Sequence, residues 1–202
     1  MQSDTDAPLL MATEMALAHN IMISGLNSIY VQGPNVTAPK DVKAFLFYCK
    51  AWTMLVEHHH DTEEQLVFPK VEAVCPKLDI AKHKQQHGGF VGGVQDFQSY
   101  VTITTQEDYK WDDMKNLLDS FAPAMVEHLK DEIGTFLNLK DCDNFALLEA
   151  DVILPFALGN ADKTFENGAH EFPPLPFFIP YLVEYVDAID DIEDVQGISL
   201  YD

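Results

Sequence analysis

Basic residues are scarce in this sequence. Its 202 residues include 12 lysines and arginines against 33 aspartates and glutamates, a formal net charge of −21. So acidic a surface repels phosphate groups, so neither a nucleic acid nor an anionic membrane is an expected partner. No apolar run approaches the roughly 20 residues that span a bilayer, and the first residues lack the basic region of a secretory signal. These absences predict a soluble, cytoplasmic protein.

Cysteine is also sparse. Cys49, Cys75 and Cys142 include no close-spaced pair, which argues against a disulfide framework and for a reducing compartment. Without such cross-links, stability has to come from a hydrophobic core. Apolar residues make up 47% of the chain, enough for one sizeable core in a single domain.

Four long amphipathic patterns fill the first 140 residues, and no strand pattern accompanies them. The helices are expected from Asp6 to about Gly33, from Pro39 to about Leu66, from Asp79 to about Thr104, and from Trp111 to about Leu139. Short connections between four such helices favour an all-α, up-down-up-down four-helix bundle over residues 1–140. Residues 141–202 are expected to form a helical, proline-rich C-terminal extension packed on the bundle.

Histidines and glutamates interrupt the apolar faces of these helices. The first helix carries His19, and each of the others carries two potential ligands four residues apart: His59 with Glu63, His83 with His87, and His128 with Glu132. A spacing of four places both side chains on one face of a helix. Burying them unpaired would be costly, so a shared metal centre is expected to satisfy them together.

The run HHHDTEE on the second helix allows two registers, His59 with Glu63 or His60 with Glu64. Stepping back along the helix from His60 meets polar residues such as Thr53, which indicates a solvent face. Stepping back from His59 meets only apolar residues. The pattern therefore selects His59 and Glu63. It leaves His60 and Glu64 as surface or supporting groups, with Glu64 a candidate hydrogen-bond acceptor for a ligand histidine.

Five imidazoles and two carboxylates suit iron, zinc or manganese, and no thiolate set for a structural zinc site is present. Seven donors are too many for one ion but fit two ions bridged by the carboxylates. Two six-coordinate irons that also share a solvent-derived oxygen would keep one coordination position open, and dioxygen would bind there.

These motifs resemble the hemerythrins and their wider HHE cation-binding relatives. The resemblance covers about residues 10–140, and its most specific segments are HHHDTEEQLVFP and HKQQHGGF. The segment FAPAMVEHLKDEI looks like the fourth-helix signature of fungal HHE proteins. It implies a non-haem diiron centre with an oxo or hydroxo bridge, bridging carboxylates Glu63 and Glu132, and O2 as a ligand. The iron ligands implied by the match are His19, His59, Glu63, His83, His87, His128 and Glu132.

Two features depart from the oxygen carriers of that family. Those carriers place an aspartate five residues after the last histidine, whereas Glu132 lies four residues after His128. The chain also continues some 60 residues beyond the bundle. Both departures argue against a simple storage role.

The sequence leans towards an O2-dependent oxidase or oxygenase of a small organic molecule, because aromatic residues and prolines of the extension could shape a substrate pocket. The alternative is a reversible O2 carrier, or an O2 or iron sensor without turnover, which the many neutral imidazoles favour. A two-metal hydrolase fits less well, because it needs an open, wet cleft. No particular substrate, electron donor or oligomeric state is predicted.

Overall fold

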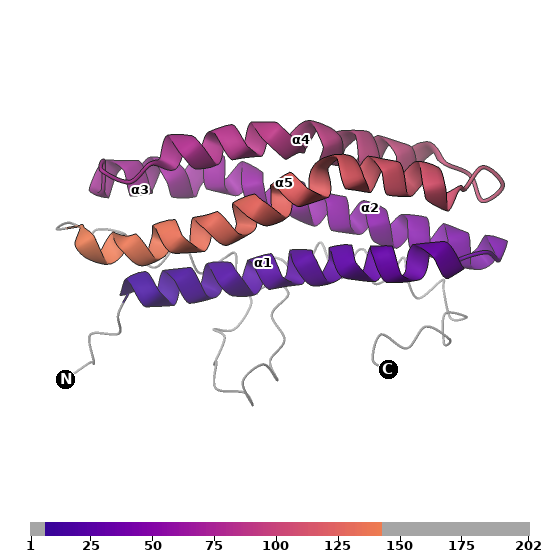
Figure 1. Cartoon of the computed structure of the whole chain (residues 1–202), viewed down its shortest axis with the longest axis horizontal. Coiled ribbons are helices and arrows are strands. Elements are labelled where there is room, and N and C mark those ends of the chain that lie inside the picture. Colours follow the sequence, from indigo (N-terminus) through magenta and orange to yellow (C-terminus); the bar gives the residue numbers. More distant parts are fainter. Residues whose placement is uncertain (1–6, 143–202) are drawn as a thin grey trace, which may run out of the picture. The chain divides into compact units, whose positions relative to one another are not determined.

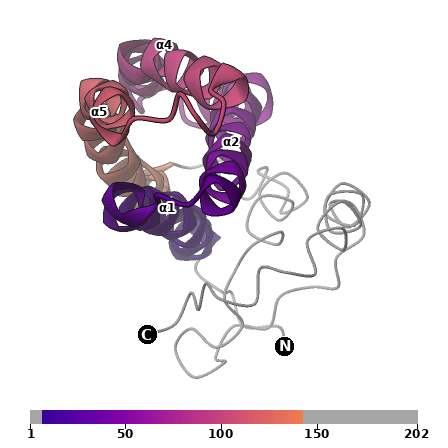
Figure 2. The same cartoon turned by 90° about the vertical axis from the view of Figure 1, so that its right-hand side faces the viewer.

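Helices account for almost all of the described chain. The computed structural model describes residues 7–142, whose long helices are α1 (Ala7–Gln32), α2 (Pro39–Thr62), α4 (Ile80–Ile103) and α5 (Trp111–Leu137). In end view these helices form a ring in which α1 and α4 each lie beside both α2 and α5 (Figure 2). The all-α expectation is confirmed for these residues, which include no strand.

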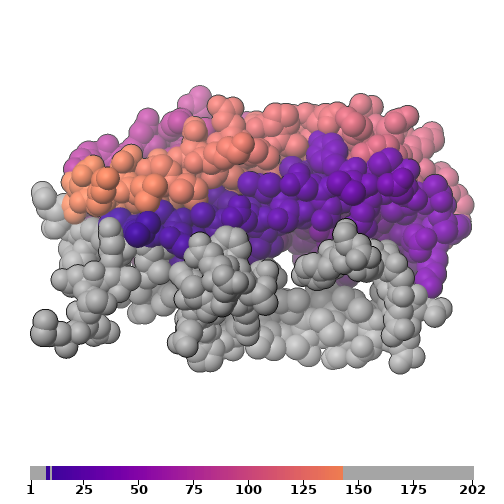
Figure 3. Space-filling model, turned by 60° about the horizontal axis from the view of Figure 1, so that its bottom comes forward, coloured from indigo at the N-terminus to yellow at the C-terminus, as the bar shows by residue number. Residues whose placement is uncertain are grey.

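Short connections keep helices that follow one another in sequence next to one another in space. The short helix η1 (Gly33–Asn35) begins the turn between α1 and α2, and the chain passes back and forth along the bundle (Figure 1). The last long helix returns to the first, so that α1 and the C-terminal part of α5 run side by side on one face (Figure 3).

Local capping explains where several helices begin. The carboxylate of Asp79 accepts a hydrogen bond of 3.1 Å from the backbone N–H of Lys82 and so caps α4. Pro39 occupies the first turn of α2, where a missing N–H costs nothing. Asp112 and Asp113 lie in the first turn of α5, where negative charge is favourable.

The sequence predicted that the second helix ends near Leu66, but the helical path continues beyond this residue. It passes through a π-helical turn, η2 (Glu63–Val67), directly into α3 (Phe68–Val74). The backbone N–H of Phe68 donates to the carbonyl of Glu63, five residues back, which defines the wider turn. Pro69 then stands in the first turn of α3, where proline is tolerated, so it does not end the helical path. The π turn therefore begins at a residue of the candidate site.

Two apolar clusters divide the core lengthwise. The larger cluster includes Trp52, Phe97 and Phe121, and the smaller one includes Phe68 and Phe136. On α1 and α4 the predicted ligands fall between residues of the two clusters, and on α5 Glu132 falls between Leu129 of the larger cluster and Phe136 of the smaller one. The candidate site is thus enclosed along the bundle by apolar side chains that exclude water.

Cys75, after α3, and Cys142, after the short helix η3 (Asn138–Asp141), form a disulfide with their Cα atoms 5.6 Å apart. The expectation drawn from their wide spacing is therefore wrong for this pair. Separation in sequence does not set distance in a bundle, and α3 and η3 end close together. The remaining cysteine of the described residues, Cys49, is buried and free.

The extension predicted for residues 141–202 lies outside the described residues, except for its first two positions. Within residues 7–142, no helix combines the length and the apolar character that crossing a membrane requires.

We predict that Cys75→Ala/Cys142→Ala unfolds more easily than the wild type. The cross-link closes a stretch of 67 residues, and a loop of that length restricts the unfolded chain by about 4 kcal/mol. Urea denaturation of both proteins measures the difference, and adding a thiol reductant should shift the wild-type midpoint alone. A reductant effect of equal size in the double variant would contradict the assignment.

Candidate metal centre

Between the two apolar clusters, α1, α2, η2, α4 and α5 direct polar side chains towards one another. All of these side chains are buried, with at most 3% of their surface exposed. They are His19, His59, His60, Glu63, His83, His87, His128 and Glu132. So many ionisable groups in one apolar core need partners that can compensate the loss of water.

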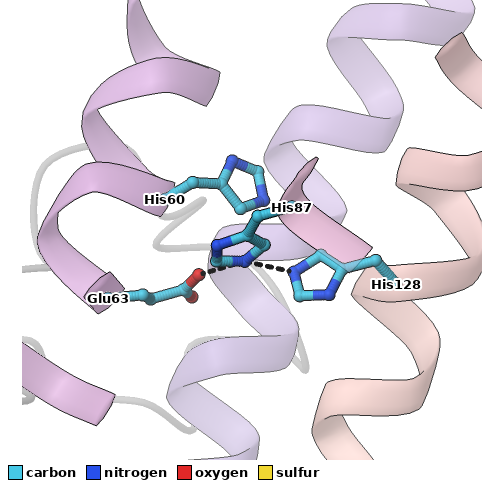
Figure 4. A group of neighbouring side chains, drawn as sticks. All are labelled: His60, Glu63, His87 and His128. Carbon is cyan, nitrogen blue, oxygen red and sulfur yellow. Dashed lines mark hydrogen bonds and ion pairs between the residues drawn. The ribbon is translucent and has the colours of Figure 1, made fainter. Parts of the chain in front are cut away.

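Seven of these residues form two groups of potential donors, and the donor atoms within each group lie within 4.8 Å of one another. The first group is His19, His59, Glu63 and Glu132. The second group is His60, Glu63, His87 and His128 (Figure 4). An ion with bonds of roughly 2.0–2.2 Å to nitrogen and oxygen fits such a spacing. Because Glu63 belongs to both groups, it stands where a bridging carboxylate would stand.

Hydrogen bonds to the outer ring nitrogens orient the histidines. Nδ1 of His19 lies 2.7 Å from the carbonyl oxygen of Leu129, and Nδ1 of His87 lies 2.9 Å from Oε1 of Glu64. Both partners only accept hydrogen bonds, so each Nδ1 is the donor, and in the neutral ring Nε2 carries the lone pair. The inward Nε2 atoms are thus available as ligands, as is typical of metal-binding histidines. The hydrogen bond expected of Glu64 is present.

Gln86 supports two further rings, and the sequence motifs gave no sign of it. Its Oε1 lies 3.4 Å from Nδ1 of His128 and 3.2 Å from Nδ1 of His83. With Nδ1 of both His87 and His128 directed outward, their Nε2 atoms face each other at 3.0 Å. Two lone pairs at that distance repel unless a cation or a proton lies between them.

The two carboxylates provide the test of whether a cation fits. Oε1 of Glu63 is 2.8 Å from Nε2 of His59, and Oε2 of Glu132 is 3.2 Å from Nε2 of His19. No oxygen of Glu63 or Glu132 accepts a hydrogen bond of acceptable geometry, and each contact is an ion pair only when its histidine is protonated. Fully buried carboxylates in that condition are costly. The donor set therefore fits a metal cation, which would supply the missing positive charge.

In the metal-free protein, protons supply part of that charge. Burial opposes protonation of His19, but Glu132 and Glu63 outweigh it and raise the pKa of His19 to about 9. Burial and the charge of Glu63 raise the pKa of Glu132 to about 8. The pKa of Glu63 itself lies well below its ordinary value, because nearby histidines, with His59 foremost, outweigh its burial. A bound cation would displace protons from these groups.

The structure corrects the sequence interpretation of His60, which is 3% exposed rather than on the surface. Thr53, taken as a mark of the solvent face, is fully buried, and its hydroxyl donates to the carbonyl of Lys50 over 2.8 Å. The buried face of α2 is wide enough to include both His59 and His60. Glu63 lies four residues after His59 and three after His60, so it shares a helix face with each of them. A broad apolar face on this helix, in place of the narrow face assumed from the sequence, would have placed His60 among the buried residues.

His83 is buried with the others but belongs to neither donor group. Its Nε2 lies 2.7 Å from the hydroxyl oxygen of Thr135, and its Nδ1 faces Gln86. Its ring centroid is 5.7 Å from that of His128, so it borders the second group. The structure thus brings together six of the seven predicted ligands, adds His60, and leaves His83 beside them.

Comparisons with known proteins point to the same kind of site. Residues 11–139 match the family model described as the hemerythrin HHE cation binding domain. The chain is 38% identical over 193 residues to the dimeric xanthone biosynthesis cluster protein R11 of Cryptosporiopsis sp. (strain 8999). The match covers 88% of this chain and 73% of that protein. No solved structure matched the chain significantly.

We predict that Glu132→Gln stabilises the metal-free protein at neutral pH. The folded-state pKa of about 8 lies above the ordinary 4.5. The folded chain therefore retains a proton that the unfolded chain releases, and Glu132 lowers stability progressively as pH rises from about 4.5 to about 8. Glutamine does not titrate, so the advantage of the variant should grow with pH over that window, by at most about 1.4 kcal/mol per pH unit.

Urea denaturation at pH 5 and pH 8, in the presence of a chelator, measures this difference. The exposed Glu127 lies on the same helix, and Glu127→Gln serves as the control that should show no such pH dependence. A variant Glu132→Gln less stable than the wild type at pH 8 would show that the buried carboxylate is compensated without metal.

Proposed function

Because this chain belongs to the hemerythrin HHE cation-binding family, we propose that its buried centre holds two iron ions and binds dioxygen. The cation-binding character of the domain is the premise, and iron and dioxygen are the proposal. The observation that carries it is the position of Glu63 in both donor groups, because two adjacent sites that share one carboxylate suit a bridged pair of ions.

The proposed ligands are the seven residues that the sequence pattern and the family resemblance select. One ion would take His19 and His59, and the other would take His83, His87 and His128, with Glu63 and Glu132 shared between them. For His83 this requires leaving Thr135, its present hydrogen-bond partner. When bound, the two irons would supply the redox chemistry that dioxygen binding requires.

The surrounding residues would protect and orient this centre. Leu129, Glu64 and Gln86 fix the ring orientations of three histidines through their Nδ1 atoms. The apolar clusters on either side of the centre exclude water, which limits side reactions of activated dioxygen.

We further propose that the protein is an O2-dependent oxidoreductase acting on a small organic molecule. The relative from Cryptosporiopsis is named for the biosynthesis of a dimeric xanthone, a small organic product. The alternative, a reversible carrier or a sensor, is favoured by the donor set, in which neutral imidazoles outnumber carboxylates.

Admission of oxygen to the anaerobically reduced, iron-loaded protein separates these functions. A carrier should give an optical adduct that is stable for many minutes and disappears when oxygen is removed. An oxidase should return to its oxidised spectrum irreversibly, faster when a suitable organic substrate is present. Absence of any oxygen-dependent spectral change would contradict both functions.

We predict that Glu63→Ala loses both ions, because Glu63 is the one residue common to the two donor groups. Wild-type protein from iron-replete cells should contain about two irons per chain. His128→Ala, which affects one group, should first lose one ion. Elemental analysis together with protein quantification gives the counts.

Asp61→Ala is the matched control, since Asp61 is an exposed carboxylate on the same stretch of helix and should not affect iron content. A wild-type count of one ion, or zinc alone after iron-replete expression, would contradict a diiron centre. Equal losses in Glu63→Ala and His128→Ala would contradict the bridging position of Glu63.

A further inference from the structure

His60 has an inward nitrogen that no other protein group satisfies. Its Nδ1 lies 2.7 Å from the carbonyl oxygen of Val56, so Nδ1 is the donor and Nε2 carries the lone pair. Nε2 is buried and makes no hydrogen bond. A histidine that served packing alone would leave this acceptor unsatisfied in an apolar core, at a cost in free energy.

The surroundings of His60 are those of a ligand. Its ring centroid lies 4.7 Å from that of His87, 5.3 Å from that of His128 and 4.8 Å from that of Phe90. Figure 4 shows the His60 ring above that of His87, with Glu63 and His128 lower down on either side. The backbone hydrogen bond to Val56 and the contact with Phe90 fix the ring in that orientation.

His60, and not His83, is the third histidine of the second donor group. Both nitrogens of His83 face protein partners, Thr135 and Gln86, and His83 is absent from the donor group that His60 completes. The second group therefore already has three imidazoles and one carboxylate without His83. His60 and His83 are therefore alternatives for one position on this ion.

We propose that His60 is an additional metal ligand that binds through Nε2 to the ion shared with His87 and His128. This rests on the proposed function, because it presupposes that the centre holds metal. His60 occupies the position for which it and His83 are alternatives, while His83 remains hydrogen-bonded to Thr135. Removing His60 then leaves the position open to a small external ligand, so this residue controls access to this ion.

Azide is the probe, because it is a small anion that binds open positions on iron and gives an optical band. We compare full-length, iron-loaded wild type with His60→Phe and with the control His58→Phe, which removes the exposed neighbouring imidazole of the same run. Phenylalanine fills the volume of the ring without a donor atom. His60→Gln is the second variant if His60→Phe folds poorly by circular dichroism.

We expect His60→Phe to keep its iron and to bind azide at least about tenfold more tightly than the wild type. A tenfold lower Kd corresponds to about 1.4 kcal/mol of binding free energy. His58→Phe should match the wild type. X-ray absorption should count one imidazole fewer in His60→Phe than in either of the others. Loss of one ion in His60→Phe alone, with the fold intact, would also support ligation.

Equal azide affinity and equal imidazole counts in all three proteins would overturn the proposal while leaving the diiron function intact. A wild-type protein that takes up no iron would overturn both. Failure of the proposed function therefore appears in the wild type itself, and failure of the His60 assignment appears only in the comparison between variants.

Discussion

Two carboxylates, Glu63 and Glu132, lie in the middle of the bundle with none of their surface exposed to water. Their desolvation is costly, and the surrounding residues compensate for it. Histidines from α1, α2, α4 and α5 converge on the two carboxylates. Hydrogen bonds to Glu64, Gln86 and the carbonyl of Leu129 hold three of the histidine rings in place. Protonated histidines can supply only part of the positive charge that the two carboxylates need, because burial lowers the pKa of histidines such as His60 and His128. The centre is therefore built at the expense of the stability of the metal-free chain, which is common where structure serves binding.

Much of the described fold could be predicted from the sequence because apolar periodicity, capping residues and prolines act locally. The start of α4 after Asp79 and the start of α2 at Pro39 follow from such signals. The continuation of the helical path through Pro69 could not be predicted in this way. It depends on a π turn, in which one backbone hydrogen bond is displaced by one residue, and the sequence composition does not indicate where this happens. The disulfide between Cys75 and Cys142 was equally hidden, since it depends on which helix ends meet in space.

The candidate site could be predicted where ligand spacing and apolar faces agreed, as for His19, Glu63 and Glu132. Prediction failed for His60, because a narrow stripe was assumed on a helix whose buried face is broad, and Thr53 was read as exposed. Gln86 was missed because an amide that supports a ligand from outside interrupts no periodic pattern.

The disulfide encloses α4 and α5, so His83, His87, His128 and Glu132 all lie within one covalently closed loop. When the chain unfolds with this bond intact, these four side chains remain confined to a small volume, and each experiences a raised effective concentration of the others. The unfolded chain then retains some affinity for the cation. That residual affinity reduces the stabilisation gained from metal binding, but it also keeps a released ion near its donors and speeds its recapture during refolding.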